Sequence, residues 1–406
     1  MFNFNLMRMA RCLLNLSKLS VPSVLGVFLL FFVACSPSSK KGGEDNINKI
    51  YSSFTPGNTW MDSDSVHINA HGGGFLYYDG KYYWFGEHKS DNTNQALVGI
   101  NCYSSTDLYN WKKEGVALPV VENDLNSPIA TGCVMERPKV IYNPDTEKFV
   151  MYFHLELPGE GYTSAYCGVA VSDNVTGPYE FLKAGRVNPK MWPANFTPEQ
   201  RSSTIQMGDL DSWTPEWIEA VRDGLFVRND YPDGQMSRDL TVFVDDDGKA
   251  YMVYASEENL TLHLAELTDD YLDFTGKYIR IAPCSHSEAP AVFKYDGQYF
   301  MIASGCSNNW APNDARLFVA DNIWGPWEQY PNPCVGDNAD VTFFSQSTYV
   351  LPVEGKENAF IFIADRWNPQ RPIDGTYVWL PVEFEDGLPV LRWQDEWDLG
   401  VFDVKN

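Results

Sequence analysis

The feature that most constrains the fold is a two-strand pattern that occurs five times along the chain. In each copy a polar residue is followed, nine positions later, by a turn residue between two apolar strands. The clearest copy starts at Asp239, continues through LTVFV to a turn that ends at Gly248, and returns through AYMVY. Apolar strands joined by Asp-Gly are typical of a β-hairpin. The other four copies pair His71 with Gly80, Glu136 with Asp145, Glu288 with Gly297, and Gln346 with Gly355.

Repeats of about 40 to 70 residues made mostly of strands are typical of a β-propeller, so the five copies predict an all-β, five-bladed propeller. The first strand of each blade lines the central axis, so the polar residues that begin the hairpins should meet around one pocket. These residues are His71, Glu136, Asp239, Glu288 and Gln346. Carboxylates held close together raise one another's pKa values, which suits acid and base catalysis. The alternative is that these acids only cap strands or accept hydrogen bonds from turn amides.

The composition limits the kind of partner that the chain can bind. A net charge of −24 argues against nucleic acids and anionic membrane surfaces, because phosphate binding requires clusters of Lys and Arg. Aromatic residues make up 15% of the chain, and their flat rings can stack on sugars or pack in the propeller core. These properties favour a neutral partner.

Residues 1–34 have the properties of a lipoprotein signal peptide. Basic residues precede an apolar run, residues 24–34, that is too short to span a membrane comfortably. Small residues are followed at once by Cys35, which would be lipidated and become the mature N-terminus; ordinary signal cleavage nearby, or an uncleaved anchor, is the alternative. Residues 35–50 are polar, as in a tether, and residues 51–406 form the propeller domain. We therefore expect a protein of the bacterial cell envelope, anchored by lipid to the outer membrane, on its periplasmic or outer face.

No motif indicates a metal or a cofactor. Six cysteines follow the export segment, and none forms a C-x-x-C motif, so a zinc cluster is not expected. They are either buried free thiols or disulfide-bonded, which an exported chain permits. The residues Asp245 to Asp247 form a hairpin turn and lack convincing spacing for Ca²⁺ ligands, so a structural Ca²⁺ has no motif to support it.

One helical insertion, residues 186–235, interrupts the repeat between the second and third blades. Within it, DSWTPEWIEAVRDG predicts one short helix that is capped by Thr214 and ends at Gly224. Because the insertion leads directly into Asp239, we expect it at the pocket as a wall or lid. Its tryptophans Trp192, Trp213 and Trp217 either stack on sugar or pack the insertion against the propeller.

Two of the hairpins resemble motifs of glycoside hydrolase family 43, whose members are five-bladed propellers with three central carboxylates. RDLTVFVDDDGKAYMVYAS is similar to the motif that carries a pKa-modulating Asp, and Asp239 matches that position. SEAPAVFKYDGQYFMIAS is similar to the motif of the general acid, and Glu288 matches it. With the blade repeat, the resemblance covers nearly all of residues 51–400.

The first blade departs from the common pattern of this family. Most members begin with an Asp-Pro whose Asp is the general base, whereas this chain has Asn69-Ala70-His71-Gly72. The phrases AHGGGFLYYDGKYYWFGEHK, ERPKVIYN and FFSQSTYVLP are instead similar to the branch that contains exo-β-1,3-galactanases. In that branch the base role is assigned to a Gln or Glu elsewhere, and Gln346 and Glu136 match those positions.

The resemblance implies an inverting, exo-acting glycoside hydrolase that releases terminal galactose from β-1,3-galactan or the arabinogalactan backbone. An α-L-arabinofuranosidase of the same family, and a glycan-binding propeller without activity, are the alternatives. The substrate is expected to contact His71, Glu87, Trp310, Asp365 and Arg366. We expect a monomer that binds a neutral plant-type oligosaccharide or polysaccharide and meets the membrane only through its lipid anchor.

Overall fold

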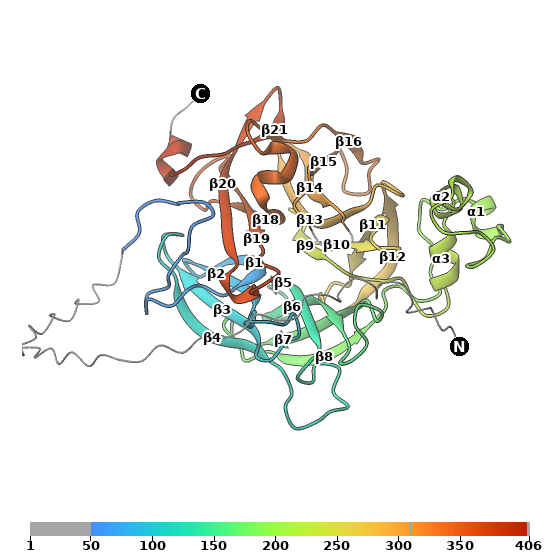
Figure 1. Ribbon diagram of the computed structural model, residues 1–406, viewed down its shortest axis with the longest axis horizontal. Helices are drawn as coiled ribbons and strands as arrows, with labels where there is room; N and C mark the ends of the chain where they lie inside the picture. Colours follow the sequence, from blue (N-terminus) through green and yellow to red (C-terminus); the bar gives the residue numbers. More distant parts are fainter. Residues whose placement is uncertain (1–49, 308–310, 404–406) are drawn as a thin grey trace, which may run out of the picture. The chain divides into compact units, whose positions relative to one another are not determined.

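The computed structural model describes residues 50–307 and 311–403, and these form a five-bladed β-propeller, as predicted (Figure 1). The first blade contains β1 (His71–Tyr78), β2 (Lys81–Glu87), β3 (Gly99–Ser105) and β4 (Lys112–Pro119). The second contains β5 (Val134–Asn143), β6 (Lys148–Glu156), β7 (Tyr166–Ser172) and β8 (Glu180–Gly185). The third contains β9 (Leu240–Val244), β10 (Ala250–Ser256), β11 (Thr261–Leu267) and β12 (Phe274–Ile281).

The fourth blade contains β13 (Ser287–Tyr295), β14 (Gln298–Gly305), β15 (Ala315–Ala320) and β16 (Glu328–Tyr330). The fifth contains β18 (Gln346–Pro352), β19 (Phe360–Arg366), β20 (Thr376–Glu385) and β21 (Leu388–Arg392), and the two-residue β17 (Cys334–Val335) adds a parallel strand to its outer edge. Each blade begins with one of the five predicted antiparallel hairpins.

The innermost strands β1, β5, β9, β13 and β18 contact one another in turn around the axis. In four of them the strand register shifts shortly after the polar residue at the entrance: His71, Glu136, Glu288 and Gln346. Such bulges bend a strand locally and re-aim its side chains. They allow these polar side chains to face the end of the axis while the strands beyond them pack in the core.

The core lies between adjacent blades and is rich in aromatic rings, among them the fully buried Trp84, Trp111 and Trp379 between the first and fifth blades. The glycines after His71 permit close packing at the axis. A Cβ atom on Gly73 would lie 2.3 Å from the indole nitrogen of Trp84, and one on Gly74 would lie 2.4 Å from Cδ of Lys139. No residue larger than glycine fits these two positions without rearrangement.

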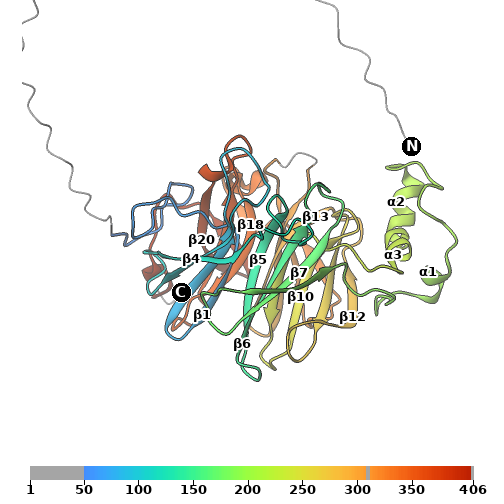
Figure 2. The same ribbon diagram turned by 90° about the horizontal axis from the view of Figure 1, so that it is seen from below.

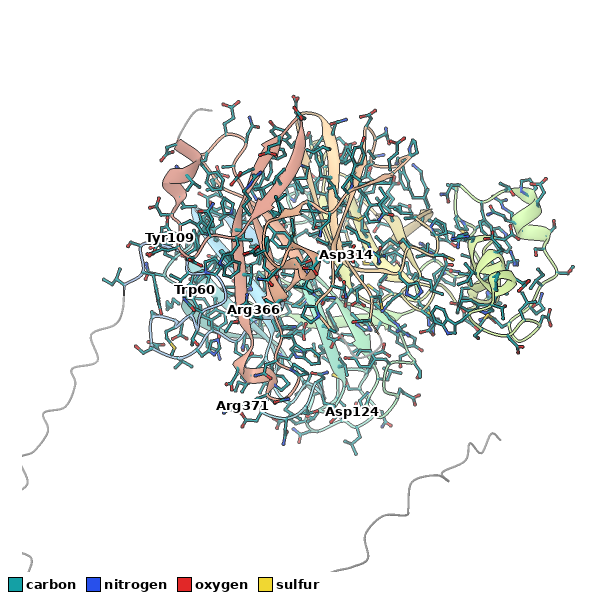
Figure 3. The ribbon with its side chains drawn as sticks, turned by 45° about the horizontal axis from the view of Figure 1, so that its top comes forward. Trp60, Tyr109, Asp124, Asp314, Arg366 and Arg371 are labelled. Atoms are coloured by element: carbon teal, nitrogen blue, oxygen red, sulfur yellow. The ribbon has the colours of Figure 1, made fainter. Side chains whose placement is uncertain are left out.

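The ring is closed by the two ends of the domain. Phe54 and Trp397 exchange backbone hydrogen bonds of 2.7 and 3.1 Å, and their rings pack 4.4 Å apart. Trp60 and Tyr109, labelled in Figure 3, belong to the same aromatic cluster, in which the Trp60 indole donates to the Tyr109 carbonyl. The tail after β21 therefore closes the ring through the segment that precedes the first blade. It adds no strand to the sheet of that blade.

The insertion between the second and third blades carries three helices, α1 (Pro198–Ser202), α2 (Pro215–Arg222) and α3 (Leu225–Asp230), which lie to one side of the blades (Figure 2). Helix α2 is the predicted one: the Thr214 side chain accepts a hydrogen bond from the Trp217 amide. The other two were not predicted, because α1 has only five residues and α3 follows Gly224, which offers no side-chain cap. Short 3-10 helices occur at η1 (Ala339–Phe344), η2 (Pro372–Asp374) and η3 (Leu399–Asp403).

The six cysteines within the described ranges are all free thiols, and four of them are buried. In the part of the chain that the structure describes, no helix has the length and apolar character needed to cross a membrane. The predicted signal peptide, Cys35 and most of the predicted tether fall outside the described residues, as does Trp310.

Candidate active site

A cavity of about 1140 Å³ lies at the end of the propeller axis where the inner strands begin. The five hairpin-entrance residues all line it: His71, Glu136, Asp239, Glu288 and Gln346. The structure thus brings together side chains that lie up to 275 positions apart, from 71 to 346. These side chains therefore meet at one pocket, as predicted.

Arg137 is the central cation of the cavity, and the sequence analysis missed it. Its guanidinium donates to the side-chain oxygen of Gln346 and lies 3.0 Å from a carboxylate oxygen of Asp239. Its backbone amide donates to Glu87 over 3.0 Å, in a residue with a φ of 56°. The only signal in the sequence was its place directly after Glu136, because its role depends on partners from three other blades.

Glu288 has the properties of a general acid. Its side chain is 9% exposed, and burial together with the negative charge of Asp239 raises its pKa to about 7. The amides of Asn259 and Gln346 each donate to one of its carboxyl oxygens, over 3.1 and 2.8 Å. These two bonds fix the orientation of the carboxyl group, and its pKa leaves much of it protonated near neutral pH.

Glu136 is held as a carboxylate on the side of the second blade. The Tyr162 hydroxyl donates to it over 2.7 Å, and Nδ1 of His154 lies 3.2 Å from its other oxygen. Burial would raise the pKa of Glu136, but His154, the charge of Lys89 and Tyr162 hold it well below its usual value. Glu136 is therefore ionised wherever the protein is folded near neutral pH.

His154 is kept protonated by the carboxylates on either side of it, Glu136 and the buried Glu156. Its Nε2 lies 2.8 Å from Glu156, which is fully buried and accepts the backbone amides of Ser164 and Ala165. Burial alone would lower the pKa of His154, but its contacts with Glu136 and Glu156 raise it to about 9. An imidazolium thus links the cavity to a carboxylate in the core.

The first blade supplies two of the predicted substrate-binding residues to the cavity wall. Glu87 pairs with Lys89 over 2.5 Å, and burial raises the pKa of its carboxyl group. Burial and the nearby charges of Lys89 and Arg137 lower the pKa of His71 well below its ordinary value. A neutral imidazole can both donate to and accept from a sugar hydroxyl.

Asp365 and Arg366 do not line the cavity. Asp365 is 2% exposed, accepts a hydrogen bond of 2.8 Å from the Gly72 amide and lies 3.9 Å from Arg137, so it supports the wall from behind. Arg366, labelled in Figure 3, donates to the Phe343 carbonyl over 2.7 Å. Phe343 belongs to a left-handed stretch of backbone just before Gln346, so Arg366 also contacts the site only through other residues. The next residue, Trp367, does line the cavity.

Within the described residues, Glu136, His154 and Asp239 form a group whose possible ligand atoms all lie within 4.8 Å of one another. Both ring nitrogens of His154 face carboxylates, and the two acids already pair with Lys89 and Arg137. The cations of the protein thus compensate the charge of this group. Its arrangement suits the orientation of side chains more than the binding of an ion.

The insertion reaches the cavity, as expected, and its tryptophans have different roles. Trp192 stacks on Tyr231 with ring centres 4.1 Å apart, and Trp217 is 6% exposed, so both pack the insertion. Trp213 lines the cavity and is 62% exposed. Arg280 fastens the insertion to the third blade: it donates to the carbonyls of Val221 and Arg222 at the end of α2 and forms two bonds of 2.7 Å with the buried Glu257.

Two family models match overlapping parts of the chain: glycosyl hydrolases family 43 over residues 212–389, and the N-terminal domain of glycosyl hydrolases family 32 over residues 63–277. A family 43 β-1,3-galactosidase solved with galactodeoxynojirimycin is 55% identical, covers 85% of this chain and 100% of its own, and superposes with a TM-score of 0.83.

Two exo-β-1,3-galactanases have similar structures. The enzyme from Phanerochaete chrysosporium, solved with β-1,3-galactotriose, is 29% identical over 86% of this chain and 68% of its own, with a TM-score of 0.69. The enzyme from Clostridium thermocellum is 32% identical over 85% and 66%, with a TM-score of 0.67.

Proposed function

Because the chain belongs to glycosyl hydrolase family 43 and is a glycosidase, we propose that it releases terminal galactose from β-1,3-linked galactan, such as the backbone of arabinogalactan. The 55% identical relative is a β-1,3-galactosidase, and it is covered over its whole length. The observation that carries the proposal is the pair formed by Glu288 and Gln346 at the predicted positions in one cavity.

Glu288 protonates the glycosidic oxygen as the bond to the leaving sugar breaks. The pKa of about 7 keeps a proton available at neutral pH, while Asp239, 3.0 Å from Arg137, supplies the negative charge that helps to raise it. Gln346 binds Glu288 directly through its amide, so it orients the acid. Its amide oxygen accepts from Arg137 and its nitrogen also donates to Ser304, so both ends of the amide are engaged.

Glu136 accepts the proton of the attacking water. An inverting glycosidase needs its acid and base on opposite faces of the sugar, with room for a water between them. Glu136 and Glu288 begin the inner strands of the second and fourth blades, which are not neighbours in the ring, whereas Gln346 comes from the blade next to Glu288. Because His154 and Lys89 keep Glu136 ionised, it has a free electron pair for the proton at every working pH.

The shape of the cavity supports attack on chain ends. Below it, the axis is filled by Lys139, which is 2% exposed and donates to the Gly72 carbonyl over 3.0 Å. A polysaccharide therefore does not pass along the axis, and we propose that a terminal sugar enters the cavity from its open end. Each round of cleavage then removes one galactose.

The test is incubation of purified residues 36–406 with β-1,3-galactan, arabinan and 4-nitrophenyl α-L-arabinofuranoside, with the released sugar identified. We expect galactose alone, first formed as the α-anomer by NMR, and loss of release in Glu288→Gln. Release of arabinose alone would identify the protein as an α-L-arabinofuranosidase. Glycan binding without release from any substrate would make it a non-catalytic propeller.

Azide separates the two candidates for the base. In Glu136→Ala, azide can occupy the space of the lost carboxylate and the water, so we expect activity to return with α-galactosyl azide as the product. Gln346→Ala is the matched variant and should not be rescued. If azide restores activity only in Gln346→Ala, then Gln346 is the residue that acts on the attacking water.

We further propose that Cys35 carries the lipid and that the propeller acts as a monomer at the outer membrane. The basic and apolar residues before Cys35 support the first part. Cys35→Ser should abolish incorporation of labelled palmitate into the full chain; incorporation that persists in this variant contradicts lipidation at Cys35.

A further inference from the structure

Trp213 lies in an unfavourable conformation at the rim of the cavity. Its side chain is 62% exposed, although tryptophan is among the largest apolar side chains. Its φ of 71° falls in the left-handed region, which is uncommon for non-glycine residues. Both the exposure of the indole and its backbone conformation are unfavourable in the free protein. A ligand in the cavity could cover the ring.

The Trp213 ring is held in place by two neighbours. Its centre lies 5.3 Å from the ring of Trp217, which is buried, and 5.3 Å from the ring of His286. All three side chains line the cavity. The indole therefore presents an apolar face that is fixed in position before any ligand binds, which reduces the entropy lost on binding.

The position of His286 shows which part of a substrate this face would meet. His286 precedes Glu288 by two residues, where β13 begins. A general acid delivers its proton to the oxygen that joins the released sugar to the rest of the chain, so its rim-side neighbours face the leaving sugar. We propose that Trp213 and His286 form the binding subsite for this second sugar, the one that remains on the polysaccharide.

The chemistry of the two residues suits a pyranose ring. The apolar face of a galactose ring can stack on the indole, and burial together with the charge of Arg316 lowers the pKa of His286, so its imidazole is neutral. Among the described residues, that imidazole has no side-chain hydrogen-bond partner, so it is available to a sugar hydroxyl. This inference rests on the proposed function, because Glu288 must be the acid for the direction to hold.

The kinetic test compares a substrate that fills this subsite with one that does not. β-1,3-Galactobiose has a second sugar, whereas β-galactosyl fluoride has fluorine in its place. Trp213→Ala should lower kcat/KM on galactobiose about tenfold, the loss of one stacking contact, and change it less than about twofold on the fluoride. Trp213→Phe should recover part of the loss. An equal fall on both substrates, or no fall on galactobiose, overturns the proposal.

The control variant is Ile205→Ala, in the same insertion and outside the cavity lining, which should leave both rates unchanged. Calorimetry in the Glu288→Gln background decides the subsite without turnover: Trp213→Ala should weaken galactobiose about tenfold and leave galactose unchanged. If wild type cleaves neither substrate, the proposed function fails while calorimetry still decides the subsite. If Glu288→Gln binds galactobiose equally well with and without Trp213→Ala, or if neither protein binds it, the proposed subsite is overturned.

Discussion

The amide nitrogen of Gln346 donates a hydrogen bond of 2.8 Å to the carboxyl group of Glu288, and the two residues stand at the entrances of adjacent inner strands. A bond of this kind favours the ionised carboxylate and opposes the burial that raises the pKa of Glu288. The acid is thus tuned from two directions, by a donor on one neighbouring blade and by Asp239 on the other. Each direction can be tested by itself.

Replacement of Gln346 by Met should move the alkaline limb of the kcat/KM profile to higher pH. The substitution removes the donor and keeps the size of the side chain, so the pKa of Glu288 rises and the acid stays protonated longer. We expect a shift of up to about one pH unit on galactobiose. Gln329→Met, at an exposed position of β16, is the control and should leave the limb in place. A limb that moves to lower pH would contradict the assigned direction of this bond.

Asp239→Asn should move the same limb the other way. Burial is the larger cause of the raised pKa of Glu288, and the charge of Asp239 is the next, so its removal lowers that pKa toward its ordinary value. Arg137 also loses its partner at 3.0 Å and then favours the Glu288 carboxylate more strongly. We expect a fall of about one unit or more, with the exposed Asp386→Asn as control. If the limb stays at its wild-type pH, Asp239 does not modulate the acid.

Glu156→Gln should lower the pKa of His154 from about 9. The buried carboxylate of Glu156 is, after Glu136, the second group that raises this pKa, so without its charge the imidazole loses its proton at a lower pH. Titration of the His154 ring signals by NMR measures the change, and the exposed Glu328→Gln serves as control. A pKa that stays at about 9 would show that Glu156 does not act on His154.

Arg280→Met should destabilise the protein by about 3 to 5 kcal/mol near neutral pH, because it removes the cation that compensates the buried charge of Glu257. Arg280 and His263 outweigh burial and lower the pKa of Glu257 to about 2, so the stability from this pair is present above pH 4.5 and is lost as pH falls through 2. Urea unfolding measures the loss. Arg392→Met, which breaks a half-exposed pair with Glu383, should cost at most about 1 kcal/mol. Equal losses in both variants would contradict the prediction.

The fold could be predicted because its information is local and repeated. Each hairpin carries its own turn signal, such as Gly248 after Asp239, and five copies at one register leave little choice other than a propeller. The helices α1 and α3 could not be predicted, since five and six residues are too few for a periodic pattern. The partner of Trp397 in the closure of the ring could not be predicted, because its pairing with Phe54 joins segments 343 positions apart.

The candidate site could be predicted only as far as the repeat reached. Glu288 and Gln346 were found because they occupy the same register position in their blades. Arg137 was missed because it lies one residue past that position and because its contacts in the cavity are with residues of other blades. Arg366 was placed in the pocket by its position at the end of β19, although its guanidinium contacts Phe343 instead.

The convergence of five blades on one cavity also determines when a newly made chain can begin to work. A ribosome that has completed four blades has synthesised Glu288 and Asp239, but Gln346 and the Trp397 that meets Phe54 are still to come. Activity is therefore the last property that the chain acquires during synthesis. No shortened product that lacks the fifth blade therefore contains the complete set of cavity residues.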